Sequence, residues 1–394
     1  MTDIYLDHAA TTPVRPEAWE AMKPYLDGTI AGNPSSIHHF GREARKAVDA
    51  ARMSIAESLG ANTEEIIFTS GGTEADNLAI TGVARSRKHE GTHVITTEAE
   101  HHAVLHACKQ LEREGYDVTY LPVMSDGTVR MDALQEALRE DTILVTIMYG
   151  NNETGAINPI KAIGEHLRVH NALFHTDAVQ AYGVLPLDVA SLQVDLLTAS
   201  AHKINGPKGS GFLYVKKETQ LHPLFFGGEQ ERRLRPGTEN VPAIAGFGEA
   251  VQLLMNEKRE RAITYTRLVN HLLSALEDEN VAYEINGQGQ RLPHIINLHL
   301  PGISTEALLT QLDLKGIAVS SGSACTAGSF QPSHVLKAMY GEDDGRVRSS
   351  VRVSVGYGND EEQLNEAAKA IANIADQHRR LLAKKRGETN GNKQ

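Results

Sequence analysis

Residues 66–78 read Ile-Ile-Phe-Thr-Ser-Gly-Gly-Thr-Glu-Ala-Asp-Asn-Leu. The apolar start, with Glu65 before it, predicts a short buried strand over residues 65–69. Gly71 and Gly72 then permit a tight turn into a helix, whose free N–H groups and positive dipole end suit a phosphate group. Taken alone, the segment favours the simpler interpretation, a turn in which Thr73 caps the helix.

Short apolar runs like this one recur along the chain and alternate with helical patterns. The expected strands are residues 93–97, 117–121, 143–148, 173–176, 194–198 and 211–215, and the expected helices include residues 103–113 and 131–139. In residues 103–113, apolar side chains fall at positions i, i+3, i+4 and i+7 and form one stripe. Alternating strands and helices predict an α/β fold with a mostly parallel sheet that is covered on both faces.

The pattern changes after about residue 250. A long charged helix is expected over residues 251–278, followed by a strand at 295–300, a helix at 304–314 and a strand at 351–355. This order predicts a smaller α+β domain. We expect a large domain over residues 15–255, a small domain formed by residues 1–14 and 256–383, and a frayed polar tail over residues 384–394.

The composition limits the classes of function. The chain has 394 residues and a formal net charge of −11, so it is expected to be a poor non-specific binder of nucleic acid. Its 2 cysteines are too few for a disulfide framework and favour a reducing compartment. No run approaches the roughly 18 apolar residues of a membrane helix, and the N-terminal segment lacks the pattern of a signal peptide. We therefore expect a cytoplasmic protein with no membrane contact and no direct nucleic-acid contact.

Two further strand ends carry candidate chemical groups. Asp177 follows the strand at 173–176, where a helix N-cap is the simpler interpretation. Lys203 follows the strand at 194–198, although most lysines are solvated surface groups. A phosphate-binding helix start, a carboxylate for a pyridinium nitrogen and a lysine that forms a Schiff base are together what pyridoxal phosphate requires. The combination therefore favours a pyridoxal phosphate site.

With these residues in place, the sequence resembles the class V, fold-type I pyridoxal-phosphate-dependent transferases, and more narrowly the NifS/IscS-type (group I) cysteine desulfurases. The resemblance extends from residues 5–13 to residues 350–356. Its motifs are residues 32–36 (GNPSS), 69–74 (TSGGTE), 100–104 (EHHAV), 151–155 (NNETG), 202–203 (HK), 235–238 (RPGT) and 321–325 (SGSAC).

The segment around Cys325 selects the subfamily. Residues 320–329 are rich in small residues, so an exposed thiol on a mobile loop is expected there. Cys108 instead belongs to the apolar stripe of residues 103–113 and is expected in the core. The length of the segment resembles the group I enzymes rather than the short-loop SufS type.

The resemblance implies a role for each motif. Lys203 would carry the cofactor and move the Cα proton, Cys325 would accept sulfur, and His101 would stack on the cofactor ring, with His102 as a rival for that position. The implied cofactor-binding residues are Gly72, Thr73, Asn152, Asp177, Gln180, Ser200, His202, Lys203 and Thr238, and the implied substrate-binding residues are Asn33, Asn152 and Arg352. Thr238 would serve the neighbouring subunit, which implies a homodimer.

The implied reaction converts L-cysteine to L-alanine through a Cys325 persulfide. The sulfur would pass to an acceptor protein for tRNA thiolation or iron–sulfur cluster assembly. The C-terminal segment is short and charged, which favours a thiolation partner. The alternatives are a selenocysteine lyase, a small-amino-acid aminotransferase or a non-catalytic sulfur-relay scaffold.

His102 and His106 are spaced i, i+4, but no His-Glu-x-x-His or Cys-x-x-Cys pattern accompanies them, so no metal site is expected. A dehydrogenase is disfavoured because no Gly-x-Gly-x-x-Gly opens the first strand–helix unit.

Overall fold

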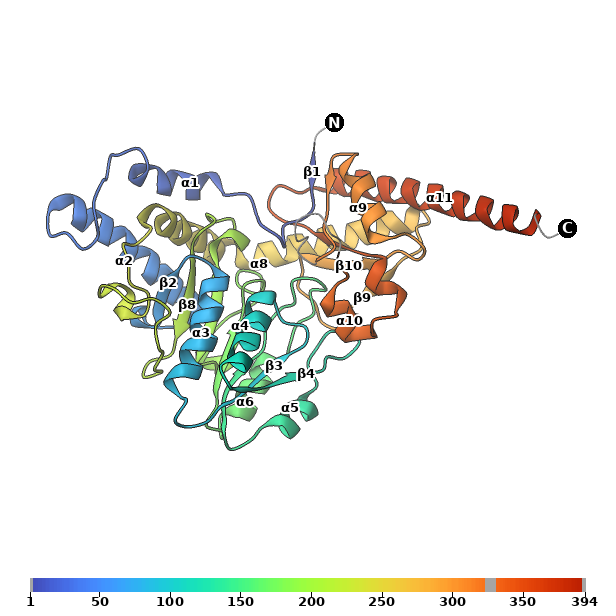
Figure 1. The fold of residues 1–394 in the computed structure, drawn as a ribbon. Coiled ribbons are helices and arrows are strands. Elements are labelled where there is room, and N and C mark those ends of the chain that lie inside the picture. The colour runs from blue at the N-terminus through green and yellow to red at the C-terminus, as the bar shows by residue number, and fades with distance from the viewer. Residues whose placement is uncertain (1–2, 323–330, 392–394) are drawn as a thin grey trace.

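The structure is a computed structural model that describes residues 3–322 and 331–391 (Figure 1). Its main sheet, in the described part of the chain, has seven strands in the order β2-β8-β7-β6-β5-β3-β4. The strands are β2 (Ile66–Thr69), β3 (His93–Thr97), β4 (Asp117–Leu121), β5 (Thr142–Thr146), β6 (Leu173–Asp177), β7 (Leu196–Ser200) and β8 (Gly211–Val215). Neighbours from β4 to β7 are parallel, and β8 is antiparallel to β7 and β2. The predicted α/β fold with a mostly parallel mixed sheet is confirmed.

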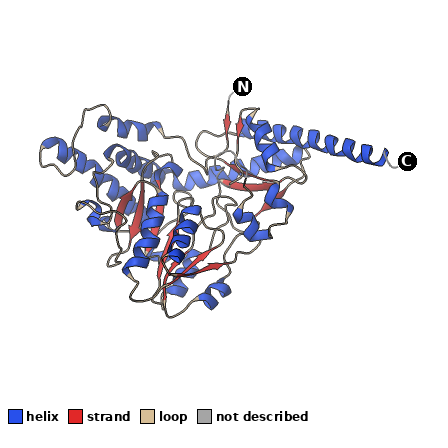
Figure 2. Ribbon diagram, viewed as in Figure 1, coloured by secondary structure: helices blue, strands red, loops and turns tan. Residues whose placement is uncertain are grey.

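Both faces of this sheet are apolar because the strands alternate their side chains between two cores. Figure 2 shows helices, in blue, around the strands of the sheet, in red. Ile66 and Phe68 of β2 belong to one core, whereas Ile67 belongs to the other. The first core includes side chains from α1 (Pro16–Met22), α2 (His39–Leu59), α5 (Met131–Ala137), α6 (Ile160–Leu167) and α7 (Val189–Leu192). The second core includes side chains from α3 (Gly72–Ser86) and α4 (His102–Arg113).

The predicted bounds of the main-sheet strands hold to within two residues; β5, for example, ends at Thr146 rather than at residue 148. β3, β4 and β8 have the expected bounds, while β7 begins at Leu196, two residues later than expected. The reason is Asp195, whose carboxylate accepts a hydrogen bond from the backbone N–H of Phe174 at 2.9 Å and so takes part in the turn.

A second unit packs beside the main sheet (Figure 1). It contains the antiparallel sheet β12-β10-β9 and the parallel pair β1-β11. Its elements are β1 (Ile4–Tyr5), β9 (Glu284–Asn286), β10 (Ile295–His299), α9 (Thr305–Asp313), β11 (Ile317–Ala318), α10 (His334–Tyr340), β12 (Ser350–Ser354) and α11 (Glu361–Gly391). The exact boundaries proposed between the two domains stay a prediction.

Helix α8 (Val241–Asp278) connects the two units. At 1.5 Å per residue its 38 residues extend over about 57 Å. Phe247 near its start lies in the first core, and Leu272 near its end lies in the core of the second unit. The helix begins ten residues earlier than predicted because Asn240 caps it, accepting a hydrogen bond from the N–H of Ala243 at 3.3 Å.

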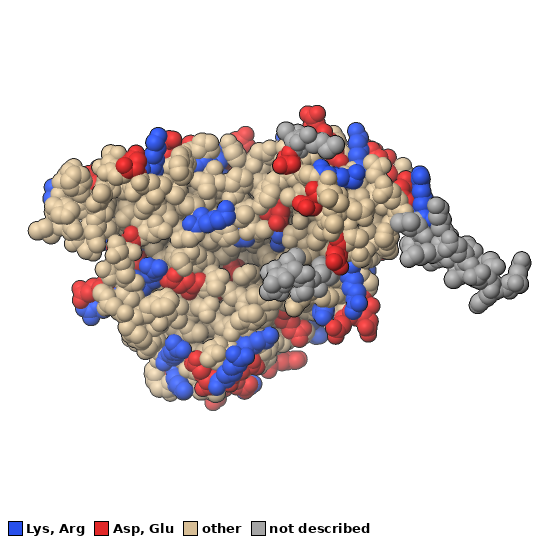
Figure 3. Space-filling view, turned by 45° about the horizontal axis from the view of Figure 1, so that its top comes forward, with Lys and Arg blue, Asp and Glu red and all other residues tan. Residues whose placement is uncertain are grey.

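The C-terminal segment differs from the expectation. The backbone of α11 stays helical through Gly391, so the predicted frayed tail from residue 384 is wrong for most of that range. Within the described residues, no helix is both long enough and apolar enough to cross a membrane. On the face drawn in Figure 3, acidic and basic side chains are interspersed.

Candidate active site

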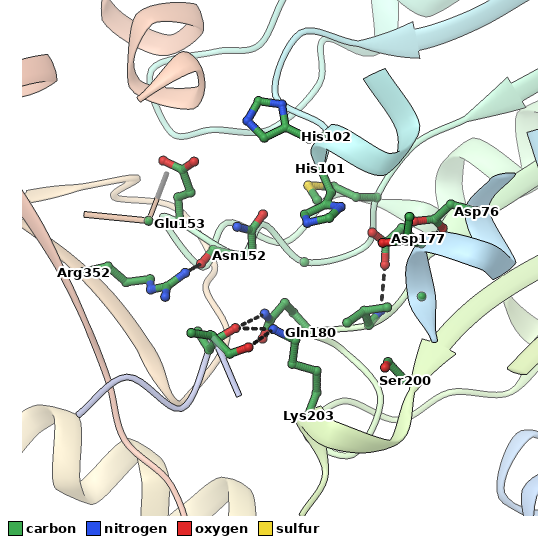
Figure 4. Close-up of a pocket in the computed structure, with 18 of the residues that line it drawn as sticks. Asp76, His101, His102, Asn152, Glu153, Asp177, Gln180, Ser200, Lys203 and Arg352 are labelled. Atoms are coloured by element: carbon green, nitrogen blue, oxygen red, sulfur yellow. Dashed lines mark hydrogen bonds between the residues drawn. The ribbon is translucent and has the colours of Figure 1, made fainter. Parts of the chain in front are cut away.

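A cavity of about 520 Å³ lies at the carboxyl ends of the main-sheet strands, next to the second unit (Figure 4). Ligand sites in open α/β sheets occupy this edge, and pockets of about 300–1,000 Å³ hold small molecules. The predicted site residues that line it are Gly72, Thr73, His101, Asn152, Asp177, Gln180, Ser200, His202, Lys203 and Arg352.

Lys203 reaches the cavity from η3 (Ala201–Lys203), the short helix that follows β7. Its Nζ donates hydrogen bonds to the carbonyl oxygens of Ala9 and Ala10, the second at 2.8 Å. Burial of the amine, and to a smaller degree the charge of Arg352, lowers the pKa of Lys203 to about 7. A large fraction of the amine is therefore uncharged near neutral pH, which is its nucleophilic form.

The start of α3 forms a place for an anion. No side chain among the described residues caps this helix, and Gly72 and Thr73 of its first turn line the cavity, so the free N–H groups and the dipole of the helix start are available there. Gly71 has φ 150°, and a Cβ on the facing Gly211 would lie only 2.7 Å from the Gly71 Cα. These two glycines let the turn and β8 approach each other closely. The buried hydroxyl of Ser200, near Gly71, has no hydrogen-bond partner among the described residues, so it remains available to a phosphate oxygen.

Asp177 ends β6 and faces the cavity. Its carboxylate accepts a hydrogen bond from the backbone N–H of Val179 at 2.9 Å. Burial raises the pKa of Asp177 to about 6, while the Val179 hydrogen bond and the charge of Lys203 act in the opposite direction. At pH 7 the group is therefore mostly ionised, as an acceptor for a protonated ring nitrogen must be.

Gln180 and His202 also turn toward the N-terminal segment. Gln180 donates from Nε2 to the carbonyl of Ala9 at 2.8 Å, and its Oε1 lies 3.4 Å from Nε2 of His294. His202 contacts the hydroxyl of Thr11 through Nδ1 at 3.2 Å. These contacts fix the orientation of both side chains before any ligand binds.

His101 and His102 point in different directions (Figure 4). His101 caps α4 by accepting a hydrogen bond from the N–H of Ala103 at Nδ1, at 3.1 Å. His101 is exposed at the cavity, but desolvation of its ring, with the charge of Lys203 as the next cause, lowers the pKa of His101 to about 4. The ring is therefore neutral, and because Nδ1 accepts, Nε2 carries the proton. The ring of His102 instead lies beside the ring of His334, with centroids 4.6 Å apart. This geometry favours His101 for the ring-stacking position, which stays a proposal.

Arg352 comes from β12 of the second unit and is 3% exposed. It donates to the carbonyl of Asn152 at 2.7 Å and to the carboxylate of Asp7 at 2.6 Å. Its Nε has no hydrogen-bond partner among the described residues. An arginine that is held in this way keeps a fixed N–H group for a carboxylate ligand.

Two described residues of the predicted site, Asn33 and Thr238, do not line the cavity, and Cys325 is not among the described residues. Asn33 is exposed in the segment before α2, where its side chain accepts a hydrogen bond from the N–H of Ser35 at 2.9 Å, so the chain does not bring it to the site. Thr238 is exposed and does not line the cavity of its own chain. Cys325 lies outside the described residues, although Gly322 lines the cavity.

Sequence reasoning missed other residues that line the cavity, among them Asp76, Glu153 and His334. Glu153 is buried, and it accepts a hydrogen bond from the hydroxyl of Ser333 at 2.5 Å. Asp76 follows Thr73 by three residues, so helical spacing alone could have placed it on the same face. His334 carries no such signal, because only the tertiary fold brings α10 to the cavity.

Asp76, His101 and Asp177 bring one possible metal-ligating atom each to within 4.8 Å of one another. Asp76 and Asp177 both line the cavity as well. The absence of a metal therefore stays a prediction.

The donor set fits pyridoxal phosphate. An uncapped helix start and the unpartnered Ser200 hydroxyl match the phosphate, and an ionised Asp177 matches the pyridine nitrogen. An uncharged amine at Lys203 matches the aldehyde.

The comparisons with known proteins agree with this chemistry. The family described as Aminotransferase class-V matches residues 4–366. A relative from Bacillus subtilis (strain 168), whose name contains the words cysteine desulfurase IscS 1, is 57% identical over 375 residues and covers 95% of this chain and 99% of its own length. "Cysteine desulfurase IscS" of Dictyoglomus turgidum is 46% identical over 380 residues, with 96% of each chain covered. A solved structure titled "NIFS-LIKE PROTEIN" has a TM-score of 0.89 and 35% identity, and the match covers 95% of this chain and 100% of that one.

Proposed function

Because this chain belongs to the class-V aminotransferase family, we propose that it is a pyridoxal-phosphate-dependent cysteine desulfurase. One observation carries the proposal: Lys203, Asp177 and the Ser200 hydroxyl beside an uncapped helix start share one cavity. The relatives that cover nearly the whole chain are named cysteine desulfurases, which supports the choice of substrate.

Several side chains would hold the cofactor. The start of α3, Thr73, Ser200 and His202 would bind its phosphate, and Gln180 would donate a hydrogen bond to its phenolic oxygen. The adjacent Asn152 also lines the cavity and would contact both the cofactor and the substrate. The bound cofactor supplies an electron sink for the charge that develops at the substrate Cα.

The chain's own groups move the protons. Lys203, whose pKa is lowered to about 7, accepts the Cα proton and later returns a proton to the product. Asp177 keeps the ring nitrogen protonated through its negative charge. The neutral ring of His101 would donate a hydrogen bond from its Nε2–H to the substrate sulfur and so orient it. Arg352 binds the substrate carboxylate and sets the orientation of the amino acid.

Sulfur transfer requires the thiolate of Cys325. This thiolate attacks the sulfur of L-cysteine, so a sulfur–sulfur bond forms as the Cβ–S bond breaks. The electron pair of the broken bond stays on Cβ, which takes up a proton, and L-alanine leaves. The Cys325 persulfide then passes its outer sulfur to an acceptor protein for tRNA thiolation or iron–sulfur cluster assembly.

The assembly proposed is a homodimer in the cytoplasm. Large apolar side chains are exposed on the main-sheet unit, among them Ile37 (92%) and Phe226 (79%). A second copy that covers such residues would bring the exposed Thr238 toward the partner's cofactor. The reducing environment suggested by 2 cysteines supports the cytoplasm. Neither a membrane nor nucleic acid is proposed as a direct partner.

Mass spectrometry after incubation with L-cysteine tests the function. We expect Cys325 to gain the mass of one sulfur atom while alanine accumulates. Cys325→Ser should bind cofactor but form no persulfide. Cys108→Ala is the matched control, because Cys108 is buried in the core and should never be labelled. If Cys325→Ser releases alanine at the parent rate, the enzyme is instead a lyase that does not need Cys325.

A further inference from the structure

Asp76 is a buried acid in the cavity that none of the roles above uses. It lies on α3, one turn after the helix start, and is 1% exposed (Figure 4). Its Oδ1 has no hydrogen-bond partner among the described residues. An unpartnered buried carboxyl group disfavours folding, so its position in the cavity indicates a role in binding.

The neighbouring histidine cannot satisfy this oxygen. His175 contacts the hydroxyls of Thr146 and Thr198 through its two ring nitrogens, at 2.8 and 3.0 Å. Its Nε2 lies 3.8 Å from Oδ1 of Asp76, which is too far for a hydrogen bond. Burial lowers the pKa of His175 to about 3, so the ring is neutral and offers no positive charge. The hydroxyl of Thr198 interacts with the Asp76 carboxyl group and leaves Oδ1 as the free atom.

The surrounding charges determine which acid is ionised. Five titratable groups lie around Asp76. His175 and Asp177 come from β6, Glu100 and His101 from the turn between β3 and α4, and Lys203 from η3. Burial, followed by the charge of Asp177, raises the pKa of Asp76 well above its ordinary value. Burial also raises the pKa of Glu100 to about 8. Only Asp177 has both a backbone N–H donor and the nearby charge of Lys203, so the negative charge resides there.

We infer that Asp76 is a positioning residue for the ring-nitrogen end of the cofactor: a neutral carboxylic acid whose proton faces Asp177 and keeps the negative charge on that residue. One oxygen of each residue lies within 4.8 Å of the other, a separation that a direct contact or one water molecule can bridge. The inference rests on the proposed function only for the identity of the cofactor.

This role predicts opposite behaviour of two substitutions. Asp76→Asn keeps a neutral donor of the same size, so the affinity for pyridoxal phosphate should stay within about threefold of the parent protein. Asp76→Ala removes the donor and should weaken cofactor binding about tenfold. Asp177 then becomes the more basic partner, and the proton should move from the ring nitrogen toward its carboxylate.

Nitrogen NMR with ¹⁵N-labelled pyridoxal phosphate measures this directly. At the same pH, the holoenzyme and Asp76→Asn should show a protonated ring nitrogen, whereas Asp76→Ala should shift toward the unprotonated signal. Thr81→Val is the control, since Thr81 is a buried polar residue of α3 that does not line the cavity. It should change neither the affinity nor the signal.

The stability of the cofactor-free protein gives a second measurement. A buried acid that keeps its proton makes the folded state bind more protons than the unfolded state, so stability falls as the pH rises above about 4. Asp76→Asn has no acid at this position, so its stability should decrease less as the pH rises. At pH 8 the variant should be at least as stable as the parent protein. This measurement remains available if Asp76→Ala does not fold.

Two results would overturn the inference. One is an unchanged nitrogen signal and affinity in Asp76→Ala. The other is an Asp76→Asn variant that binds cofactor as weakly as Asp76→Ala, which would show that a negative charge at position 76 is needed. Neither measurement uses L-cysteine, so a parent protein that fails to release alanine would refute the proposed function without deciding the role of Asp76.

Discussion

Replacing Ser200 with alanine should affect the cofactor-free and the cofactor-bound protein in opposite directions. The Ser200 hydroxyl is buried without a hydrogen-bond partner among the described residues, next to the uncapped start of α3. An unsatisfied buried polar group costs about 1–3 kcal/mol, so its removal should stabilise the cofactor-free protein by about 1 kcal/mol. For a chain of this length that gain corresponds to a rise in Tm of about 1 °C.

The bound state should respond in the other direction. A hydrogen bond to a charged group contributes about 1.5–3 kcal/mol, so Ser200→Ala should weaken the binding of pyridoxal phosphate roughly ten- to hundredfold. The affinity is measured by titrating the cofactor-free protein and following absorbance, and the stability is measured by thermal unfolding with and without cofactor.

Ser210→Ala is a matched control for this experiment. The hydroxyl of Ser210 is likewise buried and unpartnered among the described residues, but Ser210 does not line the cavity. It should raise the Tm of the cofactor-free protein by a similar amount and leave the affinity unchanged. Equal affinities of Ser200→Ala and the parent protein would refute the assignment of a phosphate position beside α3.

Three further predictions concern the lysine, the arginine and the dimer. Capture of pyridoxal phosphate by the cofactor-free protein should accelerate as the pH rises through about 7, the value to which the pKa of Lys203 is lowered, and Lys203→Ala should show no covalent capture at any pH. Arg352→Lys should raise KM for L-cysteine roughly tenfold or more with a smaller change in kcat, because a lysine cannot replace a planar, held guanidinium; an unchanged KM would remove Arg352 from the substrate site. Thr238→Ala should weaken cofactor binding only in the dimer. Light scattering over a range of protein concentrations measures the oligomeric state, and titration measures the cofactor affinity. A monomer that binds cofactor with full affinity would contradict the proposed role of Thr238.

The sequence predicted the parts of the site that depend on local pattern. Asp177 and Lys203 follow apolar strands, and parallel strands end at one sheet edge, so their proximity could be predicted without coordinates. Asp76 was missed because one aspartate on a helix looks like an ordinary polar position until its burial is known. Arg352 was assigned only through a resemblance, since its approach depends on how the second unit packs on the first. The length of α8 was underestimated because capping by Asn240 is a local contact that hydrophobic periodicity does not report.

The cavity combines groups that burial drives toward neutrality. Burial lowers the pKa of Lys203 to about 7 and raises the pKa of Asp177 to about 6. Groups that transfer protons are most effective when their pKa lies close to the working pH. The same burial opposes folding, because each group is more stable when charged and solvated. Two apolar cores, on either face of the main sheet, offset that cost and hold the strand ends at fixed positions. A substitution that fills the cavity with an apolar side chain, such as Asp76→Leu, should therefore raise the stability of the cofactor-free protein and abolish cofactor binding. A loss of stability instead would show that Asp76 is satisfied within the fold.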